Sequence, residues 1–399
     1  MGKYYIVFTR TVLPQPDAAH LVRDVNSANA AANLRYATVL VYLQRGLSAL
    51  DPRAWLHAFR PREPDDELAK FYNIQECLQV ATLPIPWPID RIGRRWINSI
   101  KITTEYFFPV HILPHAGMIH TPDWDLIKAA VRNGVPVIYE RDHYRERPYE
   151  PDIVNSPLFQ VTVTVDERVR ENMIQNGMPP GKILKLHNGV NRSFFTRQPE
   201  AAEAWREQLL GERQYLVVYS GALYRFKGVD LLIDAARELP HIQFVLAGGS
   251  DFQVRAYRKQ SAAGQAGNVT FLGHVTHERL VSLLQAADAL VYPHCSGNAA
   301  TLGSPLKFFE YLASGAPMVA TEVPHVTEFK LSQLVIGWCP PDNVGQLARS
   351  IEHTLMTYPR RMEGYSASIQ FARQFSWENR MSTILSHVDG SMRPHPVRS

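Results

Sequence analysis

Short apolar runs alternate along the chain with segments in which apolar residues recur every three or four positions. Lys3–Thr9 and Ala37–Leu43 are rich in β-branched and aromatic residues, and a helical pattern over residues 18–34 separates them. A strand, a loop, a helix and a second strand in this order form a βαβ unit. Such a unit predicts a right-handed crossover and a parallel sheet.

The same alternation continues through the first half of the chain. A helix is expected to be capped near Asp123 and another to end at Gly177, among further strands at residues 117–120, 135–140, 159–165 and 182–186. The segment 45–88 contains proline and acidic clusters, and we expect it to form surface helices and loops. HNGVN, residues 187–191, ends this first run of units.

A second run of units begins at Tyr215, after a polar, Ala/Glu-rich segment at residues 197–213. Its strands are almost continuously apolar, as strands of a parallel sheet covered on both faces should be. Residues 342–387 have helical patterns, and the final helix is expected to dock through Phe375, Trp377 and Met381. Because 399 residues exceed what one hydrophobic core usually serves, we predict an α/β protein with two doubly wound parallel-sheet domains.

Composition narrows the class of protein. The chain is 45% hydrophobic and 20% charged, and it has no 18-residue apolar run to span a bilayer. The net charge of +4 is spread over both halves, so we expect no nucleic-acid partner. The three cysteines are far apart and lack CxxC spacing, which argues against disulfides and a structural zinc site. The polar N-terminus is unlike a signal peptide. These features predict a cytoplasmic protein.

The stretch 291–321 contains a short helix with clear signals at both ends. Ser304 is a favourable N-cap, Pro305 suits the first turn, and Gly315 provides a left-handed stop. The helix start follows a buried strand, so its free N–H groups and positive dipole end predict a site for an anion, typically phosphate.

A polar stripe runs along this helix through Lys307, Glu310 and Ser314. The rest of its surface is apolar, which indicates a buried helix whose stripe lines a cleft. The alternative is a Lys–Glu pair three residues apart on a solvated face.

The turn Ser220–Gly228 joins another strand to its helix and contains Arg225 and Lys227. Two cations at such a turn are well placed to hold phosphate, although they could also only keep an exposed loop soluble. Neither a Walker loop nor a GxGxxG motif is present.

Two polar segments of the first half are further candidates. His143 follows the strand at 135–140, at the strand end where open α/β sheets bind ligands, but it could be an ordinary hydrogen-bonded loop histidine. Asp123 and Asp125 could resemble a metal-binding DxD, yet they fall at a helix start, where capping explains them. The basic and aromatic segment Arg91–Lys101 could lie on an anionic membrane surface or form a solvated helix face.

The order of several motifs resembles the family 4 retaining glycosyltransferases of the GT-B fold. The motifs are YERDHY, KILKLHNGVNRSFF, YSGALYRFKGVDLLIDAA, NVTFLGHV, SPLKFFEYLASGAPMVAT and the closing FSW helix. The resemblance implies two Rossmann-like domains, an acceptor domain at 1–195 and a donor domain at 196–371. It also implies that the last helices, about 372–390, cross back to the first domain.

By this likeness Lys227, with Arg225 as a weaker candidate, would neutralise the leaving diphosphate of a nucleotide sugar, and Glu310 would bind the ribose hydroxyls. His143 would approach the donor sugar. Arg10 and His20 would contact the acceptor. The remaining donor contacts implied are Gly221, Gly273, His274, Val275, Ser304, Pro305, Leu306 and Lys307. No metal or cofactor is required.

The resemblance implies retaining transfer of a hexose from a UDP- or GDP-sugar to a hydroxyl of a glycan, lipid-linked or small-molecule acceptor, in envelope polysaccharide or glycolipid synthesis. Two positions depart from the family pattern. Leu302 stands where the first Glu of an E-x7-E pair is common, and Ala222 stands where an Arg is frequent. A non-catalytic nucleotide-sugar or glycan-binding protein, or a sugar-nucleotide epimerase on the same fold, therefore remains an alternative.

Overall fold

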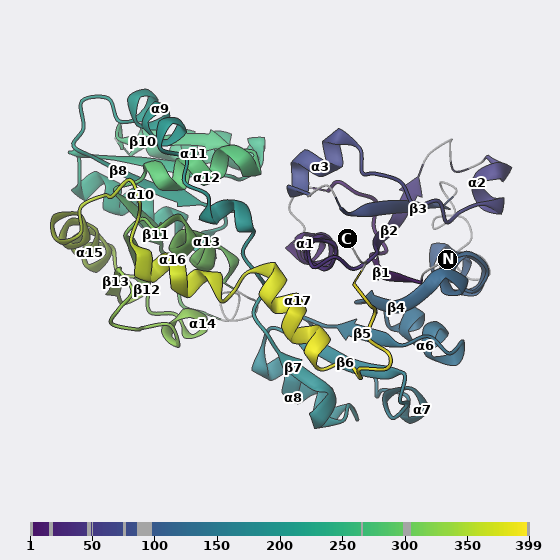
Figure 1. The fold of residues 1–399 in the computed structure, drawn as a ribbon. Helices are drawn as coiled ribbons and strands as arrows, with labels where there is room; N and C mark the ends of the chain where they lie inside the picture. Colours follow the sequence, from purple (N-terminus) through teal and green to yellow (C-terminus); the bar gives the residue numbers. More distant parts are fainter. Residues whose placement is uncertain are drawn as a thin grey trace. The chain divides into compact units, whose positions relative to one another are not determined.

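The structure is a computed structural model that describes residues 3–15, 19–45, 49, 51–74, 77–85, 98–264, 266–297 and 305–396. The chain divides into two compact units (Figure 1). Unit 1 comprises Met1–His187 and Trp377–Ser399, and unit 2 comprises Asn188–Ser376.

Unit 1 is built on a parallel sheet of seven strands in the order β3-β2-β1-β4-β5-β6-β7. The order reverses direction at β1, which pairs with both β2 and β4. The strands are β1 (Tyr4–Phe8), β2 (Thr38–Arg45), β3 (Gln79–Ile85), β4 (Ala116–Thr121), β5 (Val137–Glu140), β6 (Phe159–Thr164) and β7 (Ile183–Lys185).

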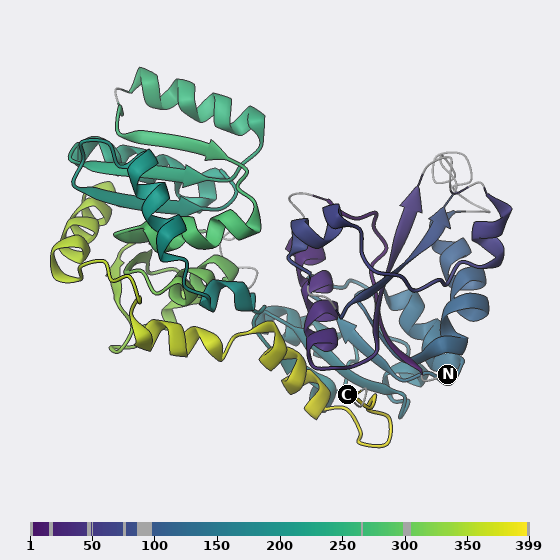
Figure 2. The same ribbon diagram turned by 45° about the horizontal axis from the view of Figure 1, so that its top comes forward.

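Helices cover both faces of this sheet. Figure 1 shows α1 on one side, where it packs against α17, and α6 on the other. The first and last described residues, 3 and 396, both belong to this unit (Figure 2). Its helical segments are α1 (Ala19–Asn33), α2 (Pro52–Leu56), α3 (Asp66–Tyr72), α5 (Ser99–Lys101), the π-helical η2 (Ile102–Ile112), η3 (Leu113–His115), α6 (Trp124–Arg132), α7 (Pro151–Val154), α8 (Glu167–Gln175), η4 (Pro180–Lys182) and α17 (Trp377–Ser386).

Strand β3 corrects the expectation that residues 45–88 form only helices and loops. Its sequence, QVATLPI, contains Pro84, which cannot donate to a sheet ladder and so weakens the strand signal. The proline is tolerated because β3 is the edge strand next to β2, and the isolated antiparallel bridge between Arg62 and Val80 on its other side lies away from Pro84.

Unit 2 contains a six-stranded parallel sheet in the order β10-β9-β8-β11-β12-β13. The strands are β8 (Tyr215–Ser220), β9 (Ile242–Ala247), β10 (Val269–Gly273), β11 (Ala289–Tyr292), β12 (Met318–Thr321) and β13 (Ile336–Cys339). The helical segments are η5 (Arg192–Phe195), α9 (Pro199–Leu209), η6 (Arg225–Lys227), α10 (Val229–Glu238), α11 (Asp251–Ala263), α12 (His277–Ala286), α13 (Leu306–Ser314), α14 (Pro324–Thr327), α15 (Val344–Thr357) and α16 (Ser366–Arg373).

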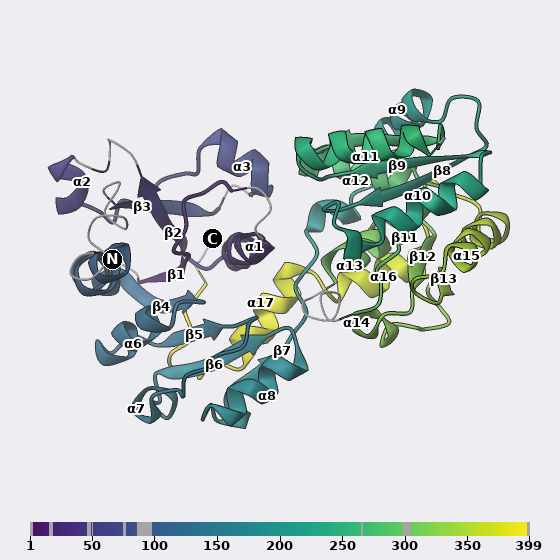
Figure 3. The same ribbon diagram turned by 180° about the vertical axis from the view of Figure 1, so that it is seen from behind.

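Alternate residues of β8 serve two separate hydrophobic cores. Leu216 and Val218 join the apolar side chains of α12 and α13, whereas Val217 and Tyr219 join those of α10 and α15. Helices α10 and α15 pack side by side on their face of the sheet (Figure 3). The prediction of two doubly wound parallel-sheet domains is therefore confirmed.

Helix α13 begins one residue later than the sequence signals indicated. Pro305, at φ −80° and ψ 63°, occupies the N-cap position, and its carbonyl accepts the first helical bond from the amide of Phe309 at 3.3 Å. Ser304, the expected cap, lies outside the described residues. Gly315 ends the helix in the left-handed conformation at φ 73°, as predicted.

Candidate functional site

Strands β8 and β11 lie side by side at the centre of the unit 2 sheet, where the strand order reverses. The helices that follow them, α10 and α13, belong to opposite faces. In open α/β sheets this arrangement leaves a crevice beyond the carboxyl ends of the two strands, and ligands bind there. The segments after β8 and β11 are the two that the sequence singled out.

The turn after β8 is held close to the exit of β11. Gly228, the N-cap of α10, has φ 74°, and a Cβ added there would lie 1.8 Å from the carbonyl oxygen of Pro293. The amide of Cys295 also donates to the carbonyl of Phe226 at 3.0 Å. Only glycine permits this close approach, which brings the Lys227 turn to the β11 exit.

Glycines lie at the carboxyl ends of three neighbouring strands, β8, β9 and β10. The Gly221 amide donates to Ala247 at 2.9 Å, and the Gly248 amide donates to Gly273 at 2.6 Å. A Cβ on Gly248 would lie 2.2 Å from the carbonyl oxygen of Gly221. His274 and Val275 follow at the end of this row. Gly221 and Gly273 were expected here from the resemblance, whereas Gly248 was not, although it begins the Gly-Gly pair that directly follows β9.

Lys227 and Lys307 are close enough to repel each other at this edge. Burial, and then the positive charge of Lys307, lower the pKa of Lys227 from 10.5 to about 8. No carboxylate pairs with Lys227 within the ranges that the structure describes, and its Nζ lies 5.3 Å from the centre of the Phe226 ring. An unpaired, partly desolvated ammonium of this kind favours an anionic ligand.

Glu310 projects from α13 and pairs with Lys307, whose Nζ lies 2.7 Å from its Oε2. The Lys–Glu pair foreseen as an alternative is thus present, but on a largely buried helix: the Glu310 side chain is only 11% exposed. Ser314 does not continue this stripe into a cleft, because its hydroxyl is buried and donates to the carbonyl of Tyr311 at 2.7 Å.

Tyr311 fastens α13 to the exit of β8. Its hydroxyl accepts from the Ser220 amide at 2.7 Å and donates to the Ser220 carbonyl at 3.2 Å. The helix that contains Lys307 and Glu310 and the turn that contains Lys227 therefore share a rigid anchor.

Two histidines that the sequence analysis missed also lie here. Burial, followed by Lys227 and His325, lowers the pKa of His294 well below its ordinary value, and its ring stacks on Tyr292 with centroids 3.9 Å apart. Burial likewise lowers the pKa of His277, against an opposing effect of Glu310. Both rings are therefore neutral at pH 7, which leaves the lysines as the cations. The signal for His294 was its place directly after a buried strand.

Arg225 does not join the two lysines. Its side chain is 90% exposed, and its Nε donates to Asp230 at 3.1 Å.

The candidates of unit 1 lie near the carboxyl edge of its sheet. Arg10 follows β1 and pairs with Asp123, which follows β4. Asp123 accepts from the amides of Asp125 at 3.1 Å and Leu126 at 3.3 Å, so its interpretation as a helix cap is confirmed. His143, in the loop after β5, and His20, in the first turn of α1, are exposed.

No cluster of three or more His, Cys, Asp or Glu side chains suited to a metal occurs in the part of the chain that the structure describes. The three cysteines are unpaired. Within the same ranges, none of the helices is both long and apolar enough to cross a membrane.

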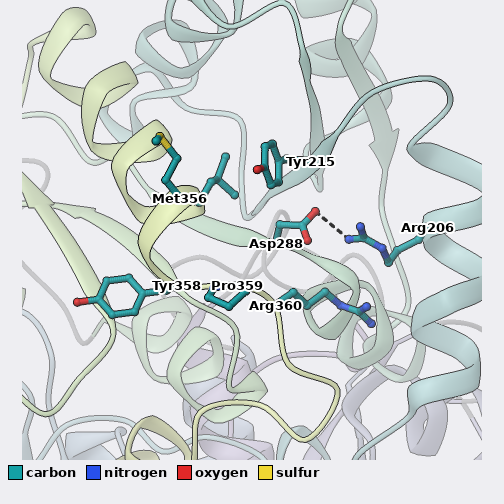
Figure 4. Close-up of a pocket in the computed structure, with 8 residues that line it drawn as sticks. Arg206, Tyr215, Asp288, Met356, Tyr358, Pro359 and Arg360 are labelled. Atoms are coloured by element: carbon teal, nitrogen blue, oxygen red, sulfur yellow. Dashed lines mark hydrogen bonds and ion pairs between the residues drawn. The ribbon is translucent and has the colours of Figure 1, made fainter.

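A cavity of about 470 Å³ lies at the opposite edge of the unit 2 sheet (Figure 4). Its charged groups are already compensated: Arg206 pairs with Asp288 at 2.8 Å, and Arg360 pairs with Glu203 at 2.7 Å. Both arginines also donate to carbonyls at the end of α12. The cavity is lined by Arg206, Tyr215, Asp288, Leu355, Met356, Tyr358, Pro359 and Arg360. We attribute the two arginines to capping of the end of α12. The candidate site is therefore the one at the carboxyl edge of the sheet and not this cavity.

Residues 214–357, which include both strand exits, match the family described as glycosyl transferases group 1. The D-inositol 3-phosphate glycosyltransferase of Mycobacterium tuberculosis is 28% identical over 235 residues, 57% of this chain. The match spans 48% of that relative's length.

Solved structures are similar over almost the whole chain. Anabaena Alr3699/HepE in complex with UDP and glucose has a TM-score of 0.63 at 16% identity and covers 96% of this chain and 99% of its own. Sucrose-phosphate synthase from Thermosynechococcus elongatus has a TM-score of 0.64 at 16% identity, with 96% and 97% covered. These likenesses show the GT-B fold, and the match to the group 1 glycosyltransferases is limited to residues 214–357.

Proposed function

We propose that the protein is a retaining glycosyltransferase that moves a hexose from a UDP- or GDP-sugar to an acceptor hydroxyl. The observation that supports this most directly is Lys227, which lies next to the start of α13, has a pKa of about 8 and pairs with no carboxylate among the described residues. A leaving diphosphate gains negative charge as the glycosidic bond breaks, and a preorganised cation stabilises that charge.

Each element at this edge has a role in the proposal. Lys227 neutralises the leaving diphosphate, with Arg225 as a weaker contributor from the exposed side of the turn. Glu310 accepts hydrogen bonds from the ribose hydroxyls. Backbone and side-chain contacts to the donor come from Gly221, Gly273, His274, Val275, Ser304, Pro305, Leu306 and Lys307.

The acceptor binds to unit 1 in this proposal, and unit 2 binds the donor. His143 approaches the donor sugar, and Arg10 and His20 contact the acceptor. The acceptor hydroxyl attacks the anomeric carbon from the face that the diphosphate leaves, and its proton passes to a leaving phosphate oxygen. Neither a metal nor a cofactor enters this route.

We propose a glycan, lipid-linked or small-molecule acceptor, and a place in envelope polysaccharide or glycolipid synthesis. The names of similar proteins support the donor class: one structure contains UDP and glucose, and one relative is a D-inositol 3-phosphate glycosyltransferase. UDP-sugars and inositol phosphate are therefore the first compounds to test.

The test is nucleotide release from a panel of UDP-, GDP- and ADP-sugars with acceptors present. Lys227→Ala and Glu310→Ala should each lower turnover at least about tenfold, because each removes a charged contact to the donor. Lys259→Ala, at an exposed lysine on α11, is the matched control and should leave turnover unchanged. Full activity in both site variants would show that the site assignment is wrong.

The departures at Leu302 and Ala222 favour one competing function, a non-catalytic nucleotide-sugar or glycan-binding protein. Calorimetry that shows tight donor binding without hydrolysis or transfer would support it. Isomerisation of the donor without an acceptor would instead identify an epimerase.

We also propose peripheral contact with an anionic membrane from the cytoplasmic side through Arg91–Lys101. Only residues 98–101 of that segment are described, and there Ile100 is 45% exposed next to the exposed Lys101. Apolar and basic side chains together favour an anionic lipid surface. Failure to sediment with anionic liposomes at low salt would remove this part of the proposal.

A further inference from the structure

A cluster of buried titratable side chains lies inside unit 1, at the end of β5. Apart from the partly exposed Asp142, each of its side chains is at most 3% exposed. We call it the Glu140 cluster, and its members are Arg23, Asp24, His120, Glu140, Asp142 and Arg380.

Arg23, from α1, contacts three carboxylates with one guanidinium. Its Nε and Nη2 donate to Oδ1 of Asp24 at 3.1 and 2.8 Å, and its Nε lies 3.1 Å from Oε2 of Glu140. Its Nη1 donates to Oδ2 of Asp142. The three carboxylates belong to α1, to β5 and to the loop after β5, so Arg23 connects all three elements.

Glu140 is held from its other side by Arg380 of α17, which donates to its Oε1. The Nε of Arg380 also donates to the carbonyl of His187 at 3.0 Å. Burial alone would raise the pKa of Glu140, but Arg380 and Arg23 outweigh burial and lower it, so this carboxylate stays ionised. Buried ion pairs generally add little stability over an apolar replacement, so stability alone does not account for the cluster.

The contact with Asp142 extends the cluster into the loop that contains His143. In the same loop, Arg141 donates from its Nε to the carbonyl of His143 at 2.7 Å and from its Nη2 to the carbonyl of Tyr144 at 2.7 Å. The backbone around His143 is thus fixed by two guanidinium groups, while its own side chain is exposed.

We propose that Arg23 is a positioning residue for the transfer reaction: through Asp142 it fixes the loop that presents His143 at the carboxyl edge of the unit 1 sheet. The inference rests on the proposed function of His143. Lysine cannot replace arginine in this role, because a single ammonium lacks the planar fork that bonds several carboxylates at once.

The test compares Arg23→Lys, Asp142→Asn and the control Asp24→Asn, which removes charge from a different partner of the same guanidinium. Asp142→Asn should accelerate backbone hydrogen exchange over residues 142–146 and lower kcat about tenfold, because a loosened loop misplaces His143. UDP affinity should stay within about twofold, since the donor contacts lie in unit 2. Arg23→Lys should reproduce this pattern. The double variant Arg23→Lys/Asp142→Asn should lose no more kcat than either single variant, because both changes break the same contact.

Asp24→Asn should lower Tm while loop exchange and kcat stay unchanged. Equal losses of kcat in Asp24→Asn and Asp142→Asn would overturn the proposal, since the cluster would then act only through stability. Faster loop exchange with full kcat would also overturn it and leave the glycosyltransferase function intact. If the wild-type protein transferred no sugar, the proposed function would be wrong. Unchanged backbone hydrogen exchange over residues 142–146 in Asp142→Asn would by itself refute the role of Arg23.

Discussion

The pH dependence of UDP binding provides a sharp test of the Lys227 site. In the free protein, burial and Lys307 lower the pKa of Lys227 to about 8. A bound diphosphate stabilises the charged ammonium and raises this pKa again. Affinity for UDP should therefore be greatest below pH 8 and should fall as the pH rises above it.

The size of the effect follows from the protonated fraction of Lys227. With a pKa of about 8, about nine-tenths of the molecules have a charged Lys227 at pH 7 and about one-tenth at pH 9. UDP should thus bind about tenfold more weakly at pH 9, a loss of ~1.4 kcal/mol. The terminal phosphate of UDP, with a pKa of about 6, is already about nine-tenths ionised at pH 7, so its own titration changes the affinity little over this range.

Calorimetric titration of UDP at pH 7, 8 and 9 and constant ionic strength measures this change. Lys227→Arg is the matched control, because arginine stays charged and its affinity should be flat over the same range. Lys307→Met removes the charge that repels Lys227, so the pKa of Lys227 should rise. In this variant, which keeps Lys227, the fall in UDP affinity should therefore occur at a higher pH. Equal pH dependence in wild type and Lys227→Arg, or constant wild-type affinity up to pH 9, would refute the reasoning.

The same lowered pKa predicts the effect of Lys227 on stability. Between pH 8 and 10.5 the unfolded chain holds a proton at Lys227 that the folded protein has lost, so this group makes stability rise with pH in that window. At pH 7 the charged lysine destabilises the unliganded fold, and Lys227→Met should stabilise it by ~1–3 kcal/mol in urea unfolding. A variant that is more stable but binds UDP poorly is the expected signature of a binding residue.

Three further substitutions test other parts of the structure. Gly228→Ala should lower the free energy of unfolding by about 2–4 kcal/mol, because φ is 74° and the added Cβ meets a carbonyl oxygen, while Gly267→Ala, with nothing within 4 Å, should be nearly neutral. Glu140→Gln should lower the free energy of unfolding at pH 7 by ~3–5 kcal/mol, because it leaves two buried guanidinium groups without their shared carboxylate. The control Glu146→Gln, at an exposed residue, should leave the free energy of unfolding unchanged. Glu310→Gln should weaken UDP binding by ~1.5–3 kcal/mol and abolish the preference for UDP over 2′-deoxy-UDP; a retained preference would exclude Glu310 as the ribose ligand.

The fold could be predicted largely from local patterns. Continuous apolar runs such as Leu216–Tyr219 occur in strands covered on both faces, and the alternation with helices leaves few topologies other than doubly wound parallel sheets. The missed strand β3 shows where this reasoning stops. A proline is unfavourable within a sheet in general, and only the position of β3 at an edge makes Pro84 acceptable.

The candidate site could be predicted only in part. Lys227, Lys307 and Glu310 stood out because they lie at a strand-to-helix turn and on an otherwise apolar helix. His294 and Gly248 did not stand out, because their significance depends on which strands are neighbours. The separation of Arg225 from Lys227 was likewise invisible, since only the turn geometry directs one side chain to solvent and the other towards Lys307.

The sequence by itself determined that there are two doubly wound sheets, most of their strands and helices, and the helix whose start faces a strand end, because periodicity, turn residues and caps act over a few neighbouring positions. The tertiary structure decided which of these ends meet. It placed Gly228 against Pro293, Tyr311 against Ser220, and Arg23 between Glu140 and Asp142. Electrostatic coupling depends on distance and burial in space, so the lowered pKa of Lys227 and the ionised, buried Glu140 arise only once distant segments pack together.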